Sequence, residues 1–243
     1  MKDNSQNRYS KDEVVASNDG ITCLKSDNKQ LNGLVYSTYV NGQLQYEGNY
    51  RDGKRDGLVR WWSESGQLMT EGNYKDGKLD GLWSFWDENA QLNSEVSYKD
   101  GIEDGLCREW YVNGKLEEET YYKGGKKDGL FRSWSENGQL NSEVNYKGGK
   151  EDGLHSYWSE NGQLLYERNY KDGKRDGLVR WWFENGQLKR ESNYKDGKEE
   201  GLQRSWHENG QFKAEENYKD GEQVSEKRWD EEGNLINDET HFD

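Results

Sequence analysis

A 24-residue period constrains this chain more than any other feature. Gly-Leu pairs recur at that spacing from Gly33-Leu34 to Gly201-Leu202, and in seven of these eight units a Trp follows the Leu by four residues. One unit reads approximately G-L-x-x-x-W-x-E-N-G-Q-L-x-x-E-x-N-Y-K-D-G-K-x-D. Such regularity is typical of architectures in which each unit packs on its neighbours. We therefore predict eight repeats over residues 33–224.

The two ends of the chain depart from this period. Residues 1–32 lack it, and we expect them to form an irregular, partly disordered N-terminal cap; plain disorder of residues 1 to about 18 is the open alternative. Residues 225–243 keep Trp229, Gly233 and Leu235, so we predict a degenerate ninth repeat and an acidic C-terminal cap. Both caps would protect sheet edges, which otherwise invite aggregation.

Inside a unit, the pattern predicts strand, turn, strand, turn. Asn-Gly and Asp-Gly between such segments are strong hairpin signals, because a type I′ turn needs positive φ at both central residues. No helical spacing runs through the unit. The predicted fold class is all-β: an elongated single-layer antiparallel β-meander of 24-residue hairpin repeats, without a two-layer core.

Composition agrees with an ordered chain. A hydrophobic fraction of 30% and a net charge of −14 would normally indicate disorder. However, aromatic residues reach 13% and proline is absent, which is unusual for a disordered acidic chain.

Two-residue turns would fix the register. A loop at Ser65-Gly66 places Arg60 opposite Glu71, Gly57 opposite Tyr74 and Trp62 opposite Met69. A second loop at Asp76-Gly77 places Glu71 opposite Leu82, and by the same count Thr70 faces Trp83.

The sheet then has two distinct faces. The constant face carries the repeated Leu and Trp of the first strand with the repeated Glu and Asn of the second. The variable face carries the repeated Leu and Tyr of the second strand and a pair of first-strand residues that changes between units. Trp182 and Leu188 are thus expected on opposite faces. Because two strand spacings are ~10 Å, Trp residues of neighbouring units should be too far apart to stack.

The repeated Glu faces an Arg in most units. The predicted structural ion pairs are Arg60–Glu71, Arg108–Glu119, Arg132–Glu143, Arg180–Glu191 and Arg204–Glu215, with Lys227–Asp238 in the last unit. Glu95 and Glu167 face serines instead. Each exposed pair should contribute only ~0.2–1 kcal/mol.

The changing positions are the candidate partner-binding residues, because repeat proteins usually keep packing positions and vary contact positions. They are Val59, Trp61, Trp83, Phe85, Phe131, Tyr157, Val179 and Trp181. The alternative is that these side chains pack on the Leu and Tyr of the neighbouring strands. Exposed aromatic patches are typical of protein interfaces.

The sequence offers little for catalysis or metal binding. His155, His207 and His241 stand in three units without ligand partners at metal-binding spacing, and Cys23 and Cys107 form no disulfide framework. A flat sheet provides no deep pocket for a nucleophile and its base. We expect no enzyme activity, no catalytic residue, no metal and no cofactor.

Charge and hydropathy limit the classes of binding partner and the cellular locations to be expected. The last 29 residues contain eleven acids and three bases, and an acidic chain is a poor candidate for nucleic-acid or anionic-membrane binding. No apolar run of 18 residues suggests a transmembrane helix, and no signal peptide is visible. We expect a cytoplasmic protein, or a cell-envelope protein if the sequence starts at a mature N-terminus.

The units YKDGKRDGLVRWWFENGQL and NYKDGKEEGLQRSWHENGQF resemble the bacterial variant of the MORN repeat. Such units occur in proteins grouped as the YwqK-type antitoxin family. The resemblance covers roughly residues 31–239 and implies an antiparallel sheet that holds a protein partner. Ala90 in place of the turn Gly, and Lys115 in place of Gln, depart from the pattern.

Two functions remain open from the sequence. The first is a non-enzymatic scaffold for protein–protein interaction, of the antitoxin, immunity or regulatory kind, with a protein partner whose identity is unknown. The second is a cell-envelope or surface protein that binds glycan, or another surface partner, through exposed Trp and Tyr.

Overall fold

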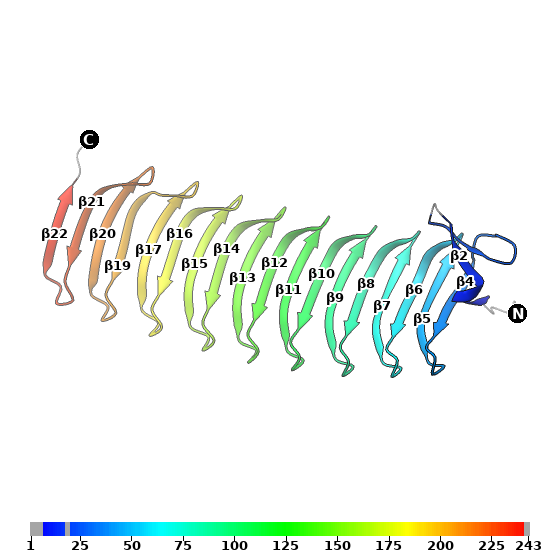
Figure 1. The fold of residues 1–243 in the computed structure, drawn as a ribbon. Coiled ribbons are helices and arrows are strands. Elements are labelled where there is room, and N and C mark those ends of the chain that lie inside the picture. Colours follow the sequence, from blue (N-terminus) through cyan, green and yellow to red (C-terminus); the bar gives the residue numbers. More distant parts are fainter. Residues whose placement is uncertain (1–6, 18–19, 241–243) are drawn as a thin grey trace, which may run out of the picture. The chain divides into compact units, whose positions relative to one another are not determined.

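The computed structural model describes residues 7–17 and 20–240 (Figure 1). The chain is an all-β antiparallel meander of 24-residue hairpin repeats, as predicted, and its described helical content is one 3-10 turn, η1 (Lys11–Glu13). It divides into two compact units. The first unit comprises residues 1–115 and 122–125, and the second comprises residues 116–121 and 126–243.

In the first unit, consecutive strands pair antiparallel from β4 to β10. Their bounds are β4 (Gly33–Thr38), β5 (Leu44–Arg51), β6 (Lys54–Trp62), β7 (Leu68–Lys75), β8 (Lys78–Trp86), β9 (Leu92–Lys99) and β10 (Ile102–Trp110). The cap before them is ordered over its described residues. Its strand β1 (Arg8–Ser10) pairs in parallel with β4, whereas β2 (Val14–Ala16) and β3 (Thr22–Leu24) pair with each other. The alternative of disorder falls partly on residues 1–6 and 18, which lie outside the described residues.

The second unit is built in the same way, and the unit boundary runs through β11 (Leu116–Lys123). The following strands are β12 (Lys126–Trp134), β13 (Leu140–Lys147), β14 (Lys150–Trp158), β15 (Leu164–Lys171), β16 (Lys174–Trp182), β17 (Leu188–Lys195), β18 (Lys198–Glu199), β19 (Gly201–Trp206), β20 (Phe212–Lys219), β21 (Glu222–Trp229) and β22 (Leu235–Thr240). The hairpin of β21 and β22 forms the ninth repeat.

The two turns of a repeat have different geometries. At Asp76-Gly77 both central residues have positive φ (50° and 83°), as a type I′ turn requires. At the other turn, the Gly66 N–H donates to the Ser63 carbonyl and the Ser63 N–H donates to the Gln67 carbonyl. This is a type I turn followed by a left-handed residue that forms a bulge. The prediction of a two-residue turn is therefore wrong at this position.

The bulge changes the register by one residue at the end of the hairpin. Gly57–Tyr74 and Arg60–Glu71 are opposed as predicted, but Trp62 pairs with Leu68 rather than Met69. Trp182 likewise pairs with Leu188, so the two side chains lie on one side of the sheet and not on opposite faces. In the next repeat, the rings of Trp206 and Phe212 lie 5.5 Å apart at the equivalent positions.

A second bulge separates successive repeats and shifts the register by two residues. Tyr74 pairs with Leu79, but Gly72 pairs with Trp83, so Glu71 faces Ser84 rather than Leu82 and Thr70 faces Phe85 rather than Trp83. An even shift leaves every side chain on its predicted face. The repeated Asn explains the bulge, because Asn49 Nδ2 donates to the Leu58 carbonyl at 2.8 Å. The adjacent Gly57 has φ of 104°, which strongly favours glycine.

Repeated polar residues also tie each repeat to the next. The carboxylate of Asp152 accepts the Asp172 N–H at 3.1 Å at the start of the following type I′ turn. At the other end, Asn41 Nδ2 donates to the Glu64 carbonyl of the following turn at 2.8 Å. Asn-Gly and the Asp of Asp-Gly-Leu therefore recur because they hold turns, and the recurrence needs no chemical role.

The buried side chains of the repeats lie mainly on the variable face. They include Val35 and Val59 in the first unit and Val144, Val179 and Gln203 in the second. In the first unit, Leu31, Val35, Tyr46 and Val59 form a buried cluster that Val14 and Leu24 of the cap pack against. The prediction of a sheet without a second layer is thus wrong where the cap covers the first hairpins.

Candidate functional site

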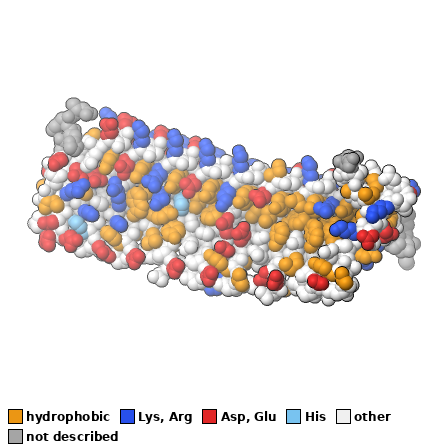
Figure 2. Space-filling model, viewed as in Figure 1, with side chains coloured by type: hydrophobic (Ala, Val, Ile, Leu, Met, Phe, Trp, Pro, Cys, Tyr) orange, Lys and Arg blue, Asp and Glu red, His pale blue; other side chains and the backbone are white. Residues whose placement is uncertain are grey.

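A row of aromatic rings crosses the variable face of the first unit. Tyr46 and Trp61 have centroids 5.3 Å apart, Trp61 and Trp83 5.7 Å, and Trp83 and Phe85 6.1 Å. We call Tyr46, Trp61, Trp83 and Phe85 the aromatic row. In Figure 2, hydrophobic side chains gather over the strands of this unit, with charged side chains beside them.

Trp61 and Trp83 belong to neighbouring repeats, and their contact contradicts the expectation that such residues cannot stack. The reason is Gly72, which lies between them on β7. A Cβ added to Gly72 would lie only 2.2 Å from Trp83 Cε2, so the indole occupies the space that a side chain would fill. The Trp83 Nε1 donates to the Asn73 carbonyl at 3.2 Å and fixes the ring there.

The variable face of the second unit has a different chemistry. Its centre holds Tyr157 stacked on Tyr166 (5.2 Å, 11° between planes) and the Arg168 guanidinium over the Tyr166 ring at 3.8 Å. Further along, Arg190 pairs with Glu199 at 3.1 Å and Glu216 at 3.5 Å. Burial raises the pKa of Glu216, although the charge of Arg190 opposes that shift.

The eight candidate partner-binding residues divide into two groups by burial. Val59 and Val179 are fully buried and Trp83 is 7% exposed, so these three side chains pack within the sheet. Five side chains remain half-buried and accessible: Trp61, Phe85, Phe131, Tyr157 and Trp181. Partner contact stays a prediction for these five.

The constant face carries the ion pairs. Arg60 Nε bonds Glu71, and the corresponding distances are 2.8 Å for Arg132–Glu143, 2.8 Å for Arg180–Glu191, 3.2 Å for Arg204–Glu215 and 3.3 Å for Lys227–Asp238. Arg108 lies in β10 and Glu119 in β11, on the two sides of the unit boundary, and their pairing stays a prediction. With side chains about one-third exposed, such pairs contribute little to stability.

His155 has partners that the sequence did not reveal. Its Nδ1 lies 3.0 Å from Glu151 Oε1, and its Nε2 lies 3.3 Å from Tyr166 Oη and 3.5 Å from Ser142 Oγ. Burial lowers the pKa of His155, while Glu151 opposes the shift. Ser142 is only 9% exposed, and both ring nitrogens of His155 have partners within the sheet, so this Ser-His-Glu arrangement is a packed polar cluster.

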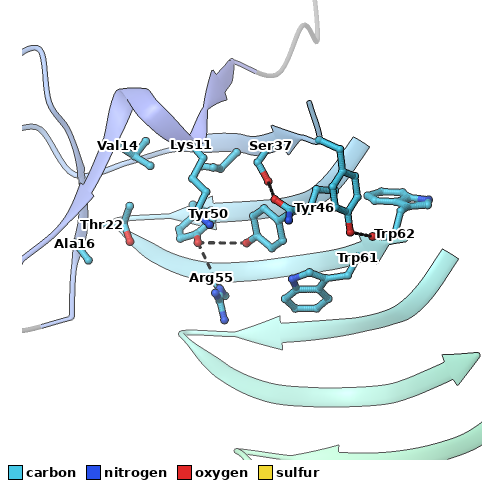
Figure 3. A pocket seen from close by; sticks show the side chains of 13 residues that line it. Lys11, Val14, Ala16, Thr22, Ser37, Tyr46, Tyr50, Arg55, Trp61 and Trp62 are labelled. Carbon is cyan, nitrogen blue, oxygen red and sulfur yellow. Dashed lines mark hydrogen bonds between the residues drawn. The ribbon is translucent and has the colours of Figure 1, made fainter. Parts of the chain in front are cut away.

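A cavity lies between the N-terminal cap and the first hairpins (Figure 3). Its volume is about 580 Å³, and its lining comes from the cap (Lys11, Val14, Ala16, Thr22) and from β4, β5, β6 and the turn after β4. Tyr46 Oη and Tyr50 Oη lie 3.3 Å apart, and Arg55 donates to Tyr50 Oη at 3.4 Å. Burial raises the pKa of Tyr46, which keeps the phenol protonated. Sequence reasoning missed this site because residues 1–32 follow no repeat.

The described residues contain no cluster of His, Cys, Asp and Glu that could hold a metal ion. They also contain no helix with the length and apolar character needed to cross a membrane.

With the fold and its surfaces defined, comparison with known families is informative. Seven copies of the MORN repeat variant match, at residues 55–76, 79–100, 103–123, 127–147, 151–172, 175–196 and 199–220. These segments cover more than half of the chain, which therefore belongs to the MORN repeat variant family. Repeats of this kind are consistent with a scaffold or binding role and are typically non-enzymatic.

Other comparisons add little. No curated protein matches the chain. Two solved structures with weak overall similarity are the TcdB2-TccC3-Cdc42 complex (12% identity, TM-score 0.24) and the TcdB2-TccC3 complex (13% identity, TM-score 0.22). The alignments cover 91% and 94% of this chain but only 14% and 16% of those chains.

Proposed function

We propose that this protein is a non-enzymatic scaffold that binds another protein through the variable face of its first unit. The observation that carries the proposal is the aromatic row, in which Trp61 and Phe85 remain accessible while Trp83 beneath them is fixed by packing. Trp and Tyr are enriched among the residues that dominate binding energy at protein interfaces. Rings held by packing also lose little conformational freedom when a partner binds.

The charge of the chain suggests the character of the partner. A net charge of −14 favours a basic protein, because charge complementarity accelerates association and disfavours acidic competitors. We propose a basic partner, of the toxin or regulatory kind that the resemblance to antitoxin-type repeat proteins implies.

The test places a photo-crosslinking amino acid at position 85 in the full-length protein. Proteins captured in the source cells would be identified, and the main captured protein would be purified for titration. We expect Trp61→Ala with Phe85→Ala to weaken its binding at least tenfold. Trp181→Ala is the matched control, since Trp181 stands at the position of Trp61 in an identical strand of the second unit. Because the proposal confines the contact surface to the first unit, this variant should leave binding unchanged.

Equal weakening by the control, or no loss in the double variant, would contradict the proposed surface. Retention on purified cell-wall glycan that depends on Trp61 would instead support the envelope function.

A further inference from the structure

The cavity beneath the cap has a lining whose charge is opposite to that of the whole protein. The chain carries 48 acidic and 34 basic residues, yet the described residues around the cavity include Lys11 and Arg55 and neither Asp nor Glu. Its other walls are uncharged: apolar and aromatic side chains such as Val14, Tyr46 and Trp61 predominate, and the polar ones are Thr22, Ser37 and Gln45. This combination of a cation and aromatic walls is suited to an anion with an apolar body.

Arg55 is the polar anchor of the cavity. Its Nε donates to Tyr50 Oη at 3.4 Å and its Nη1 donates to Tyr74 Oη at 3.2 Å, so both described acceptors are neutral phenols. The guanidinium also lies 5.2 Å from the centroid of the Tyr74 ring. A guanidinium has five N–H donors in a planar fork, and two bonds to phenols leave donors for a further acceptor.

The cavity has the size and rigidity of a ligand site. About 580 Å³ lies within the range of roughly 300–1,000 Å³ that is usual for small-molecule pockets. The Tyr46 and Trp61 rings, 5.3 Å apart and inclined at 53°, form one wall, and the packed cluster of Leu31, Val35 and Val59 supports it. Figure 3 shows Tyr46, Tyr50 and Arg55 close together beneath the cap.

We propose that this cavity binds a small aromatic carboxylate, with its carboxylate on Arg55 and its ring against Tyr46 and Trp61. A planar carboxylate matches the guanidinium fork and makes charge-assisted hydrogen bonds that a neutral phenol cannot equal. Of the two cations in the lining, Lys11 is exposed to solvent and Arg55 is half-buried, so one negative charge on Arg55 is favoured and the ligand is a monoanion.

The equivalent position in the second unit provides a matched control. Arg175 occupies the place of Arg55 in an identical strand segment, and its Nη1 donates to Tyr194 Oη at 3.5 Å. No cap segment is described over β16, and Arg175 lines none of the described cavities.

The experiment is calorimetric titration of the full-length protein with 2-naphthoate and with its neutral counterpart 2-naphthamide. We expect 2-naphthoate to bind with 1:1 stoichiometry and 2-naphthamide to bind at least tenfold more weakly. Arg55→Gln should weaken 2-naphthoate binding about tenfold, because a charge-assisted bond is lost, while Arg175→Gln leaves it unchanged. Ala16→Trp is a second variant at an exposed position of the cap; the larger side chain should fill the cavity and prevent binding even if Arg55→Gln fails to fold.

Absence of saturable 2-naphthoate binding, equal affinity for the amide, or equal weakening by Arg175→Gln would overturn the proposal. Phe85 does not line the cavity, so Phe85→Ala alone should leave 2-naphthoate binding intact whether or not it impairs partner capture. Failure of this site and failure of the proposed scaffold function can therefore be distinguished.

Discussion

Residues 52–62 and 172–182 have the same sequence, DGKRDGLVRWW, and lie in different units. They form β6 and β16 with the same bounds relative to the repeat, and Val59 and Val179 are both fully buried. Each segment has the same bulge contact, from Asn49 Nδ2 to the Leu58 carbonyl (2.8 Å) or from Asn169 Nδ2 to the Leu178 carbonyl (2.7 Å). Their backbone and their burial are thus properties of the repeat itself.

The side chains that oppose Val59 and Val179 differ, although Trp61 and Trp181 each face a Tyr of the preceding strand. Val59 is opposed by Gly48 and Gly72, which leave room for the Tyr46 ring and the Trp83 indole respectively. Val179 is opposed by Arg168 and Ser192. Trp61 joins an aromatic row, while Trp181 faces Tyr166 and Arg190. The chemistry of the variable face is therefore determined by the neighbouring strands. Substitutions on the neighbouring strands should therefore affect the stability of the two segments differently. The same substitution made within each segment should affect both equally.

The largest difference in stability between the two segments should come from substituting the small residues opposite the valines, Gly72 and Ser192. Gly72→Ala should lower the free energy of unfolding by about 2–3 kcal/mol, because the buried Trp83 ring must move away from the new methyl group. Ser192→Ala keeps its Cβ and removes a hydroxyl that accepts from Arg190 Nε, at a cost of about 1 kcal/mol. Hydrogen exchange of the backbone amides of β6, β8 and β16 would localise each effect. Equal losses of unfolding free energy for Gly72→Ala and Ser192→Ala would show that the packing of the Trp83 ring does not depend on Gly72.

Truncation of the buried valines should have the same effect in both segments. Val59→Ala and Val179→Ala should each cost about 2 kcal/mol, since each removes two buried methyl groups and leaves a small cavity. The measurement is urea unfolding together with local hydrogen exchange. A clearly larger loss of unfolding free energy for Val59→Ala than for Val179→Ala would show that the two valines are not equivalently packed.

A smaller effect should depend on pH and be confined to the second unit. Burial lowers the pKa of His155 below its usual value of 6.5. As pH falls below about 6.5, the unfolded chain takes up the proton before the folded chain does, so stability is complete above that pH and declines below it. His155→Phe should reduce the loss of stability between pH 7 and pH 5 in β14 and β15 while leaving β6 unaffected. An unchanged pH profile would show that Glu151 cancels the effect of burial, and a larger loss of stability in the variant would show that Glu151 outweighs it.

The smallest effects should be the ion pairs of the constant face. Double-mutant cycles on Arg60–Glu71 and Arg180–Glu191 should each give a coupling of about 0.5 kcal/mol, because the side chains of both pairs are about one-third exposed to solvent. Thermal unfolding of the single and double variants supplies the four values for each cycle. A coupling above about 2 kcal/mol in one segment alone would contradict their equivalence.

The sequence predicted the meander and most of its register because turn glycines and a strict period leave few alternatives. It failed at the bulges. In the sequence, nothing distinguishes Asn49 from other side chains on the constant face. The structure shows that its amide donates to the Leu58 carbonyl and that the register shifts by two residues there. The prediction for the turn at Ser65-Gly66 failed for a similar reason, since a glycine there can serve a type I′ turn or a bulge equally well.

The candidate site was predicted less well. Variation between repeats directed attention to the variable face, where partner contact stays a prediction, and it does not distinguish a contact residue from a packing residue. Val59 and Val179 stand at a position that changes between repeats, yet both are fully buried and pack against the residues opposite them, Gly72 and Ser192. The cavity beneath the cap depends on residues that follow no repeat and meet the sheet only in the folded chain, so no pattern could reveal it.

The ties between repeats have a consequence for how the chain folds. The Asp and Asn side-chain bonds connect residues 20 and 23 positions apart, as from Asp152 to Asp172 and from Asn41 to Glu64. Closing loops of this length costs little entropy, and a low sequence separation of contacts favours rapid folding even in an all-β protein. Each folded hairpin then presents the next hairpin with a strand edge and turn residues of the same kind to bond to. Whole repeats can therefore be gained or lost in evolution without redesigning the turns that remain.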